Sequence, residues 1–213
     1  MQKKTDSTSS PQAGTTISSR KLNYFSANSI SLRTQKKLAG QFPLHMTKFF
    51  IDETSSRLFE NVNQLLVLQI GCAQKANKLM KQIVKMNVKL AILNYNAVFD
   101  NRESIIASEL KDTFHNTAEC FLRIRKSHRN RLGGVNGSIE NMIAQVDQAS
   151  RLIIDLTQRH LSKKTQTKII ESFAFFGNKD FLESVLDKSK EEYSKLIDAI
   201  NEDLEELIDR GML

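Results

Sequence analysis

The sequence is poor in the residues that interrupt secondary structure. Its 213 residues include only two prolines, eight glycines and no tryptophan. Because each hairpin of a strand-rich protein needs its own turn residues, this scarcity disfavours a fold built from β-strands. Leucine, isoleucine, lysine, glutamate and glutamine are abundant instead. We therefore expect an all-α fold, and the length suits a single domain with one core.

Cysteines and long apolar runs are also scarce. Cys72 and Cys120 are the only cysteines, and both lie in apolar helical contexts, which favours a reducing compartment. The polar first twenty residues do not resemble a signal peptide, and no apolar run approaches the roughly 20 residues that span a bilayer. The sequence thus predicts a cytoplasmic protein that is soluble or peripheral to membranes.

Histidines and cysteines show no pattern typical of catalysis or metal binding. His45, His115, His128 and His160 lie far apart, and none has another histidine or cysteine three or four residues away on the same helix face. His160 closes an apolar stripe, where an imidazole bonded to a carbonyl or water is the usual interpretation. We expect no enzymatic activity, no metal site and no cofactor.

Charge is distributed unevenly along the chain. Residues 1–50 contain eight lysines and arginines but one acid, which accounts for the whole net charge of +7. From Asp180 onward, eleven acids face four bases. A basic leader therefore precedes a body that ends in an acidic segment, and the high isoelectric point does not by itself indicate nucleic-acid binding.

The leader divides into two segments. Residues 1–22 are rich in serine, threonine and glutamine and poor in large apolar groups, so we expect disorder there. Residues 23–42 predict an N-terminal amphipathic helix that ends before Pro43 and carries Arg33, Lys36 and Lys37 on its polar side. Such a helix either docks on the body or lies at a membrane surface.

Apolar residues spaced by three and four predict the helices of the body, over residues 52–210. The predicted segments are 52–71, 76–99, 100–124, 139–160, 165–176, 180–186 and a last one whose apolar face runs from Tyr193 to Ile208, and we interpret them as a six-helix bundle. The expected caps are Asp52, Asp100 with Glu103, Ser138 and Asn178 at helix starts, and Gly71 and Gly177 at helix ends. Phe173, Phe175 and Phe176 could line a ligand cavity, although aromatic residues at this spacing are usually core.

The segment 76–99 is apolar around most of its circumference, which predicts a central helix buried on most sides. One face differs, because it carries the lysine stripe Lys75, Lys78, Lys81, Lys85 and Lys89, together with Gln82. No aspartate or glutamate lies between Glu60 and Asp100, so these lysines lack a local carboxylate partner.

Two interpretations of this lysine stripe stay open. The first is a solvated face that meets the acidic stripe of the last helix, formed by Asp198, Glu202, Glu205 and Asp209. The second is a wall that faces an anionic ligand.

A further basic cluster contains Arg123, Arg125, Lys126, Arg129 and Arg131. A solvated loop is favoured there, because base stacking would need interleaved aromatic residues. Nucleic acid is therefore not an expected partner.

Several segments together resemble one family, that of tumour necrosis factor alpha-induced protein 8 and its relatives. The matching stretches are Phe25-Ser26 through Gln35-Lys36-Lys37, Phe50-Ile51-Asp52-Glu53-Thr54-Ser55-Ser56, Val88-Lys89-Leu90-Ala91-Ile92-Leu93, and Gln158-Arg159-His160-Leu161. They occur in order and at suitable spacing between Phe25 and Leu207. The resemblance implies an antiparallel six-helix bundle with an additional N-terminal helix, which together enclose an apolar cavity for lipid tails.

The resemblance also implies a function and a set of site residues. Family members look like carriers of phosphoinositides and related phospholipids that act in control of cell death, inflammation and autophagy, at peripheral membrane surfaces. The head-group residues implied here are Lys36, Lys37, Lys111 and Arg33. The implied cavity wall consists of Leu79, Ile83, Met86, Leu90, Leu93, Leu110, Phe114, Phe121, Ile143, Val146, Ile153, Phe173, Phe176 and Ile200. The alternative function is a helical adaptor that binds death or signalling proteins and needs no ligand.

Overall fold

The computed structural model describes residues 52–127, 135–187 and 189–213. These residues form α3 (Glu53–Ile70), α4 (Ala73–Tyr95), α5 (Asn101–Ser127), α6 (Val135–Thr157), α7 (Lys163–Phe176), α8 (Lys179–Leu186) and α9 (Glu191–Asp209). No strand occurs within these ranges, so the all-α prediction is confirmed for them. The described part has seven helices, one for each predicted segment, and the interpretation of these segments as a six-helix bundle is not confirmed. The predicted leader, with Arg33, Lys36 and Lys37, lies outside the described residues.

Local capping explains both boundaries of α3 and the start of α8. Asp52 accepts a hydrogen bond from the Ser55 amide at 2.8 Å and begins α3, and Gly71 ends it in the left-handed conformation at φ 65°. Asn178 accepts from the Phe181 amide at 2.9 Å and begins α8. These three predictions are confirmed. The predicted cap at Ser138 is wrong, since α6 already begins at Val135.

Two helices end earlier than predicted. α4 ends at Tyr95 rather than Phe99, because the chain reverses through Ala97, which has a positive φ of 49°. α6 ends at Thr157, whose carbonyl then accepts from the amides of His160 and Leu161 in a turn. His160 therefore lies in the α6–α7 connection and not at the end of a long helix stripe.

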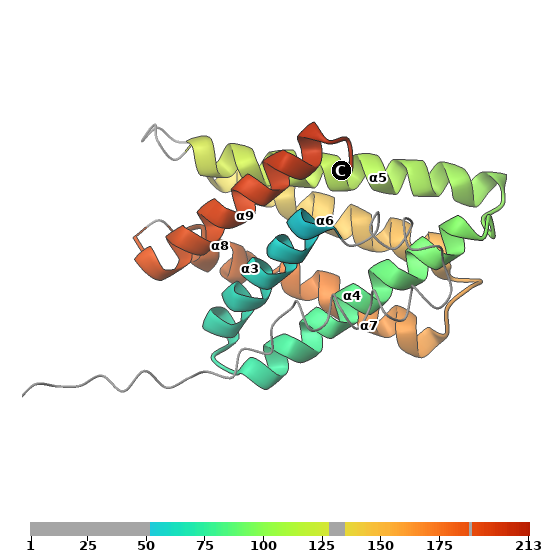
Figure 1. The fold of residues 1–213 in the computed structure, drawn as a ribbon, viewed down its shortest axis with the longest axis horizontal. Helices are drawn as coiled ribbons and strands as arrows, with labels where there is room; N and C mark the ends of the chain where they lie inside the picture. The colour runs from blue at the N-terminus through green and yellow to red at the C-terminus, as the bar shows by residue number, and fades with distance from the viewer. Residues whose placement is uncertain (1–51, 128–134, 188) are drawn as a thin grey trace, which may run out of the picture.

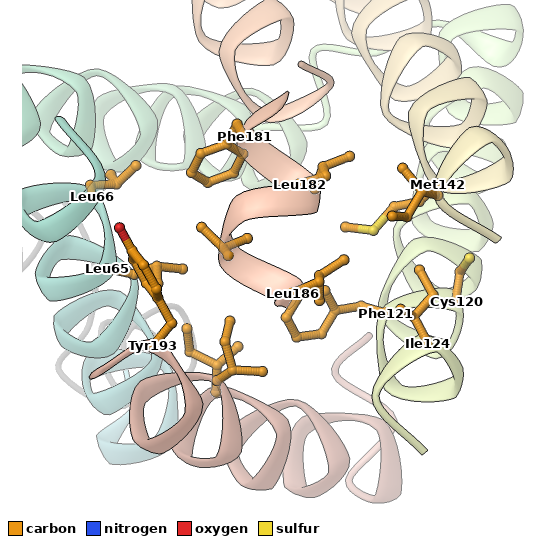
Figure 2. Close-up of a cluster of buried hydrophobic side chains, with 14 of the residues drawn as sticks. Leu65, Leu66, Cys120, Phe121, Ile124, Met142, Phe181, Leu182, Leu186 and Tyr193 are labelled. Carbon is orange, nitrogen blue, oxygen red and sulfur yellow. The ribbon is translucent and has the colours of Figure 1, made fainter. Parts of the chain in front are cut away.

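The larger apolar core lies around α8, which contributes Phe181, Leu182, Val185 and Leu186 to it, all of them buried. Figure 2 shows the α8 side chains in the middle of this cluster, with Leu65 and Leu66 of α3 on one side and residues of α5 and α6 on the other. α9 closes the cluster with Tyr193, Ile197 and Ile200. The short helix is thus the central element of this core.

α4 is not the central helix, and that prediction is wrong. Only Ala76, Met80, Val84 and Met86 are buried among its 23 residues. The helix packs against α3 and α7, along the lower part of Figure 1. Because the charged ends of the lysines must stay hydrated, a helix that carries this stripe cannot be enclosed on every side.

Polar contacts join α3 to α9. Asp203 is buried and accepts hydrogen bonds from Arg57 Nε and Asn61 Nδ2, each at 3.0 Å. Glu206 accepts from Arg57 at 2.8 Å and from Thr54. These bonds fix the direction in which α9 crosses α3. Two residues of the Asp52-Glu53-Thr54 stretch also hold α3 to the end of α9. Asp52 forms an ion pair with Arg210, and Thr54 donates a hydrogen bond to Glu206.

Replacing Asp203 with asparagine should lower the free energy of unfolding by about 1.5 kcal/mol, since it removes the buried negative charge to which Arg57 and Asn61 donate hydrogen bonds. The half-exposed Arg57 keeps Glu206 as a partner, which limits the loss. Urea unfolding would measure the change. The exposed Asp209→Asn variant is the control and should unfold like the wild type. Equal stability of the Asp203→Asn variant would contradict the prediction.

Candidate functional site

A cleft of about 850 Å³ lies between α4 and α7. Figure 1 shows these two helices next to each other, α4 in green and α7 in orange. We call it the lysine cleft, because five lysines contribute to its walls. Its lining residues are Gln74, Lys78, Lys81, Gln82, Val84, Lys85, Met86, Val88 and Lys89 from α4, and Thr165, Lys168, Ile169 and Ser172 from α7.

Helical spacing aligns the cationic groups. Four of the lysines recur every three or four residues along α4 and therefore share one face. Lys168 adds a fifth from α7. Lys89 Nζ lies 3.3 Å from Thr165 Oγ1, a polar contact between the two walls. None of the lining residues is acidic. The cleft is therefore a region of positive potential.

Three of these lysines, Lys78, Lys85 and Lys168, form no ion pair with a carboxylate in the part of the chain that the structure describes. All three are exposed at the cleft. They can therefore meet an anion from outside without first breaking an internal ion pair.

The floor of the lysine cleft is apolar. Val84, Met86 and Ile169 are buried there, and Val88 is half-buried. Ser172 and Gln82 add a polar contact of 3.4 Å across the walls. A site with charge at the rim and apolar surface beneath suits an amphiphilic anion better than a small inorganic ion, because both surfaces can be satisfied at once.

A second polar group, which we call the corner cluster, lies where the start of α5 meets the connection between α6 and α7. Asp100 and Glu103 form the predicted capping box, with the Glu103 amide 2.8 Å from Asp100 Oδ1 and the Asp100 amide 3.0 Å from Glu103 Oε2. Arg159 pairs with both carboxylates, and His160 Nε2 lies 3.0 Å from Glu103 Oε1. The cluster joins the start of α5 to the segment that leads into α7, and so positions the α7 wall.

Hydrogen bonding outweighs burial at Glu103. Burial alone would raise the pKa of this carboxyl, but bonds from the Asp100 amide, Arg159 and His160 lower the pKa below its ordinary value. The pKa of Asp100 is also lowered, by the Glu103 amide and then by Arg159. Both groups are therefore carboxylates at neutral pH. His160 binds a carboxylate rather than the carbonyl or water that its sequence context predicted.

The acidic stripe of α9 is directed toward α5 and not toward the lysine stripe. Asp198 pairs with Arg125 at 2.7 Å, and Glu205 pairs with Lys126 at 2.7 Å. The prediction that this stripe answers the α4 lysines is therefore wrong. The same contacts correct the view of Arg123, Arg125 and Lys126 as a solvated loop, because all three lie in α5 and Arg123 pairs with Glu119. Arg129 and Arg131 lie outside the described residues.

Of the predicted head-group residues, only Lys111 lies in the described part. It is on α5, and its Nζ donates to the Gly211 carbonyl at 3.2 Å. The structure therefore places Lys111 beside the C-terminal residues, whereas the residues that it brings together at the cleft are those of the α4 stripe.

The predicted cavity-wall residues are distributed over two packed apolar clusters. Leu79, Ile83, Phe121, Ile143, Phe176 and Ile200 belong to the cluster around α8. Met86, Leu90, Leu110, Phe114, Ile153 and Phe173 belong to a second cluster between α4, α5, α6 and α7. Val146 is buried beside Gly177, and Leu93 is half-buried. Only Met86 of this set lines the lysine cleft. An enclosed lipid cavity stays a prediction.

The α7 side of the cleft was not foreseen. Thr165, Lys168 and Ser172 lie about eighty residues after the α4 lysines, and no local pattern pairs the two segments. The only available signal is that both helices carry a cationic face, which does not specify that those faces meet.

The described ranges contain neither a cluster of metal ligands nor a membrane-spanning helix. No group of three or more histidine, cysteine, aspartate or glutamate side chains is placed there to hold a metal ion. None of the helices in these ranges combines the length and apolar character that crossing a bilayer requires.

Comparison with known proteins gives consistent matches over most of the chain. Residues 25–211 match the family model described as "Tumor necrosis factor alpha-induced protein 8-like". A protein of Drosophila pseudoobscura pseudoobscura named "Tumor necrosis factor alpha-induced protein 8-like protein" is 30% identical over 190 residues, which cover 89% of this chain and 97% of that protein. "Protein salivary glands marred" of Drosophila melanogaster has the same identity and coverage. "Tumor necrosis factor alpha-induced protein 8" of Mus musculus is 24% identical over 85% of this chain and 91% of its own length. None of these names denotes an enzyme activity.

Proposed function

The chain belongs to the tumor necrosis factor alpha-induced protein 8-like family, and from this premise we propose that it is a non-enzymatic protein that binds anionic phospholipids of the phosphoinositide type at the cytoplasmic surface of membranes. Its role would lie in the regulation of apoptosis, inflammation or autophagy. The observation that supports this function best is the lysine cleft, which combines exposed lysines with an apolar floor.

The chemistry of the cleft fits a phospholipid in two ways. Phosphate oxygens attract lysine ammonium groups, each of which contributes on the order of 1 kcal/mol near an anionic membrane. The apolar floor, with Val88 only half covered, offers contact to the glycerol and acyl part of the lipid. The basic leader with Lys36 and Lys37 would add attraction to the same surface.

Reversing two cleft charges tests the proposal. The double variant Lys85→Glu with Lys168→Glu should bind phosphoinositide-containing vesicles more than tenfold more weakly than the wild type, because two attractive charges become repulsive. Both side chains are exposed and outside the described ion pairs, so the melting temperature should hardly change. Co-sedimentation at low and physiological salt, beside a thermal melt, measures both quantities.

Two controls locate the effect. Lys195→Glu reverses an exposed lysine of α9, far along the chain from the cleft residues, and should bind like the wild type. Lys36→Glu with Lys37→Glu tests the leader separately. Binding that persists in the cleft variant and disappears in the leader variant would assign the lipid to the leader. If neither the wild type nor any variant binds vesicles, and native mass spectrometry finds no phospholipid on the protein, the adaptor function is favoured instead.

A further inference from the structure

The charge of the lysine cleft extends along its length, and a single lipid head group does not require this. Lys78, Lys81, Lys85 and Lys89 lie within twelve residues of α4, and the first and last are about 16 Å apart at the helical rise. One phosphate bound near Lys78 would lie too far from Lys89 to neutralise its charge. The long cationic rim therefore fits an anion whose charges are also spread over several turns of helix.

The apolar floor runs beneath this rim. Val84, Val88 and Ile169 line the cleft together with the lysines of α4 and Lys168 of α7. An apolar strip flanked by cations is the complement of an amphipathic helix whose apolar stripe is flanked by acidic residues. From Gln74 to Lys89 the α4 wall is about 22 Å long, which matches a partner helix of about four turns.

The acidic amphipathic helix that would fit this cleft is not supplied by the chain itself. Residues 1–51 contain eight lysines and arginines and one acid, and residues 128–134 contain two arginines and no acid. Charge repulsion opposes the entry of either segment into a cationic cleft. The acidic helix α9 is already packed on α3, and its carboxylates pair with α5. The complementary helix must come from another protein.

We propose that the lysine cleft is a docking groove for an acidic amphipathic helix of a partner protein. Its glutamates or aspartates, repeated every three or four residues, lie against Lys78, Lys85 and Lys168, and its leucine or isoleucine side chains cover the half-exposed Val88. The proposal goes beyond lipid binding and rests on the geometry of the cleft alone. Since lipid and helix would occupy the same lysines, binding of one excludes the other.

A designed peptide tests the groove. The probe is a fluorescent, alanine-based helical peptide of about fifteen residues with glutamates flanking a leucine stripe. Its control is an isomer of the same composition whose glutamates are spread around the helix. Fluorescence anisotropy should give at least tenfold tighter binding of the first peptide to the wild-type protein. Binding should weaken more than tenfold in the Lys85→Glu, Lys168→Glu variant and stay unchanged in Lys195→Glu, and vesicles that contain phosphoinositide should displace the peptide.

The outcomes separate this proposal from the lipid function. Equal binding of the two peptides, or undiminished binding by the cleft variant, would overturn the docking groove. Vesicle binding without peptide binding would overturn it as well and leave the lipid function intact. Peptide binding without vesicle binding would support the groove and remove the lipid function. If circular dichroism shows that the glutamate variant is unfolded, the neutral pair Lys85→Gln and Lys168→Gln replaces it, with the same direction of effect.

Discussion

Replacing Leu182 with alanine should lower the free energy of unfolding by about 2–5 kcal/mol, the range measured when a large buried aliphatic side chain leaves a cavity. Leu182 is only 2% exposed, and it belongs to the short helix α8 in the middle of the larger core, where α3, α5, α6 and α9 all contribute neighbours (Figure 2). A helix of eight residues has little stability of its own. Its position therefore depends on this packing, and the surrounding helices have few ways to close the cavity.

Urea unfolding followed by circular dichroism measures the effect. Ile170→Ala is the matched control, because it also removes a large aliphatic side chain from a helix but at a position that is 50% exposed. Its free energy of unfolding should change by less than about 1 kcal/mol. A loss at Leu182 no greater than that at Ile170 would mean that α8 is not central to the core.

Replacing Glu103 with glutamine should lower the melting temperature by several degrees at pH 7 and flatten its dependence on pH. Glu103 is buried with contacts to Arg159 and His160, so the neutral amide leaves the Arg159 guanidinium and the His160 imidazole without their shared carboxylate. The expected consequence for function is weaker vesicle binding, because the corner cluster positions the α7 wall of the lysine cleft.

The pH dependence follows from lowered pKa values. In the folded protein the pKa of Glu103 lies below its ordinary value, because bonds from the Asp100 amide, Arg159 and His160 overcome the opposing effect of burial. Unfolded aspartate and glutamate titrate near ~3.9 and ~4.3. The stabilisation is therefore fully present above about pH 5 and is lost as the pH falls through the lower folded values.

Thermal melts between pH 3 and 7 test this prediction. The wild type should lose stability steeply below about pH 4, and Glu103→Gln should lose less over the same interval. The control is Glu171→Gln, an exposed glutamate of α7, which should follow the wild-type curve. Parallel curves for the wild type and Glu103→Gln would exclude Glu103 as a source of the acid sensitivity.

The sequence alone determined the helical class, most helix boundaries and the family. Capping residues such as Asp52, Asn178 and the Asp100–Glu103 pair act within four residues of chain, so their effect can be read without tertiary information. The lysine stripe was also visible, because helical periodicity alone puts those side chains on one face.

Tertiary structure decided which faces meet. The periodicity of α4 predicted a central helix, yet the core formed around α8, because a helix with a hydrated lysine face cannot be enclosed on all sides. In the same way, the acids of α9 pair with Arg125 and Lys126 rather than with the α4 lysines. Spacing fixes the face on which a charge lies, but the face that it meets depends on how all the helices pack together. That packing also brings Lys168 and Thr165 of α7 to the same cleft as the α4 lysines, where Thr165 contacts Lys89.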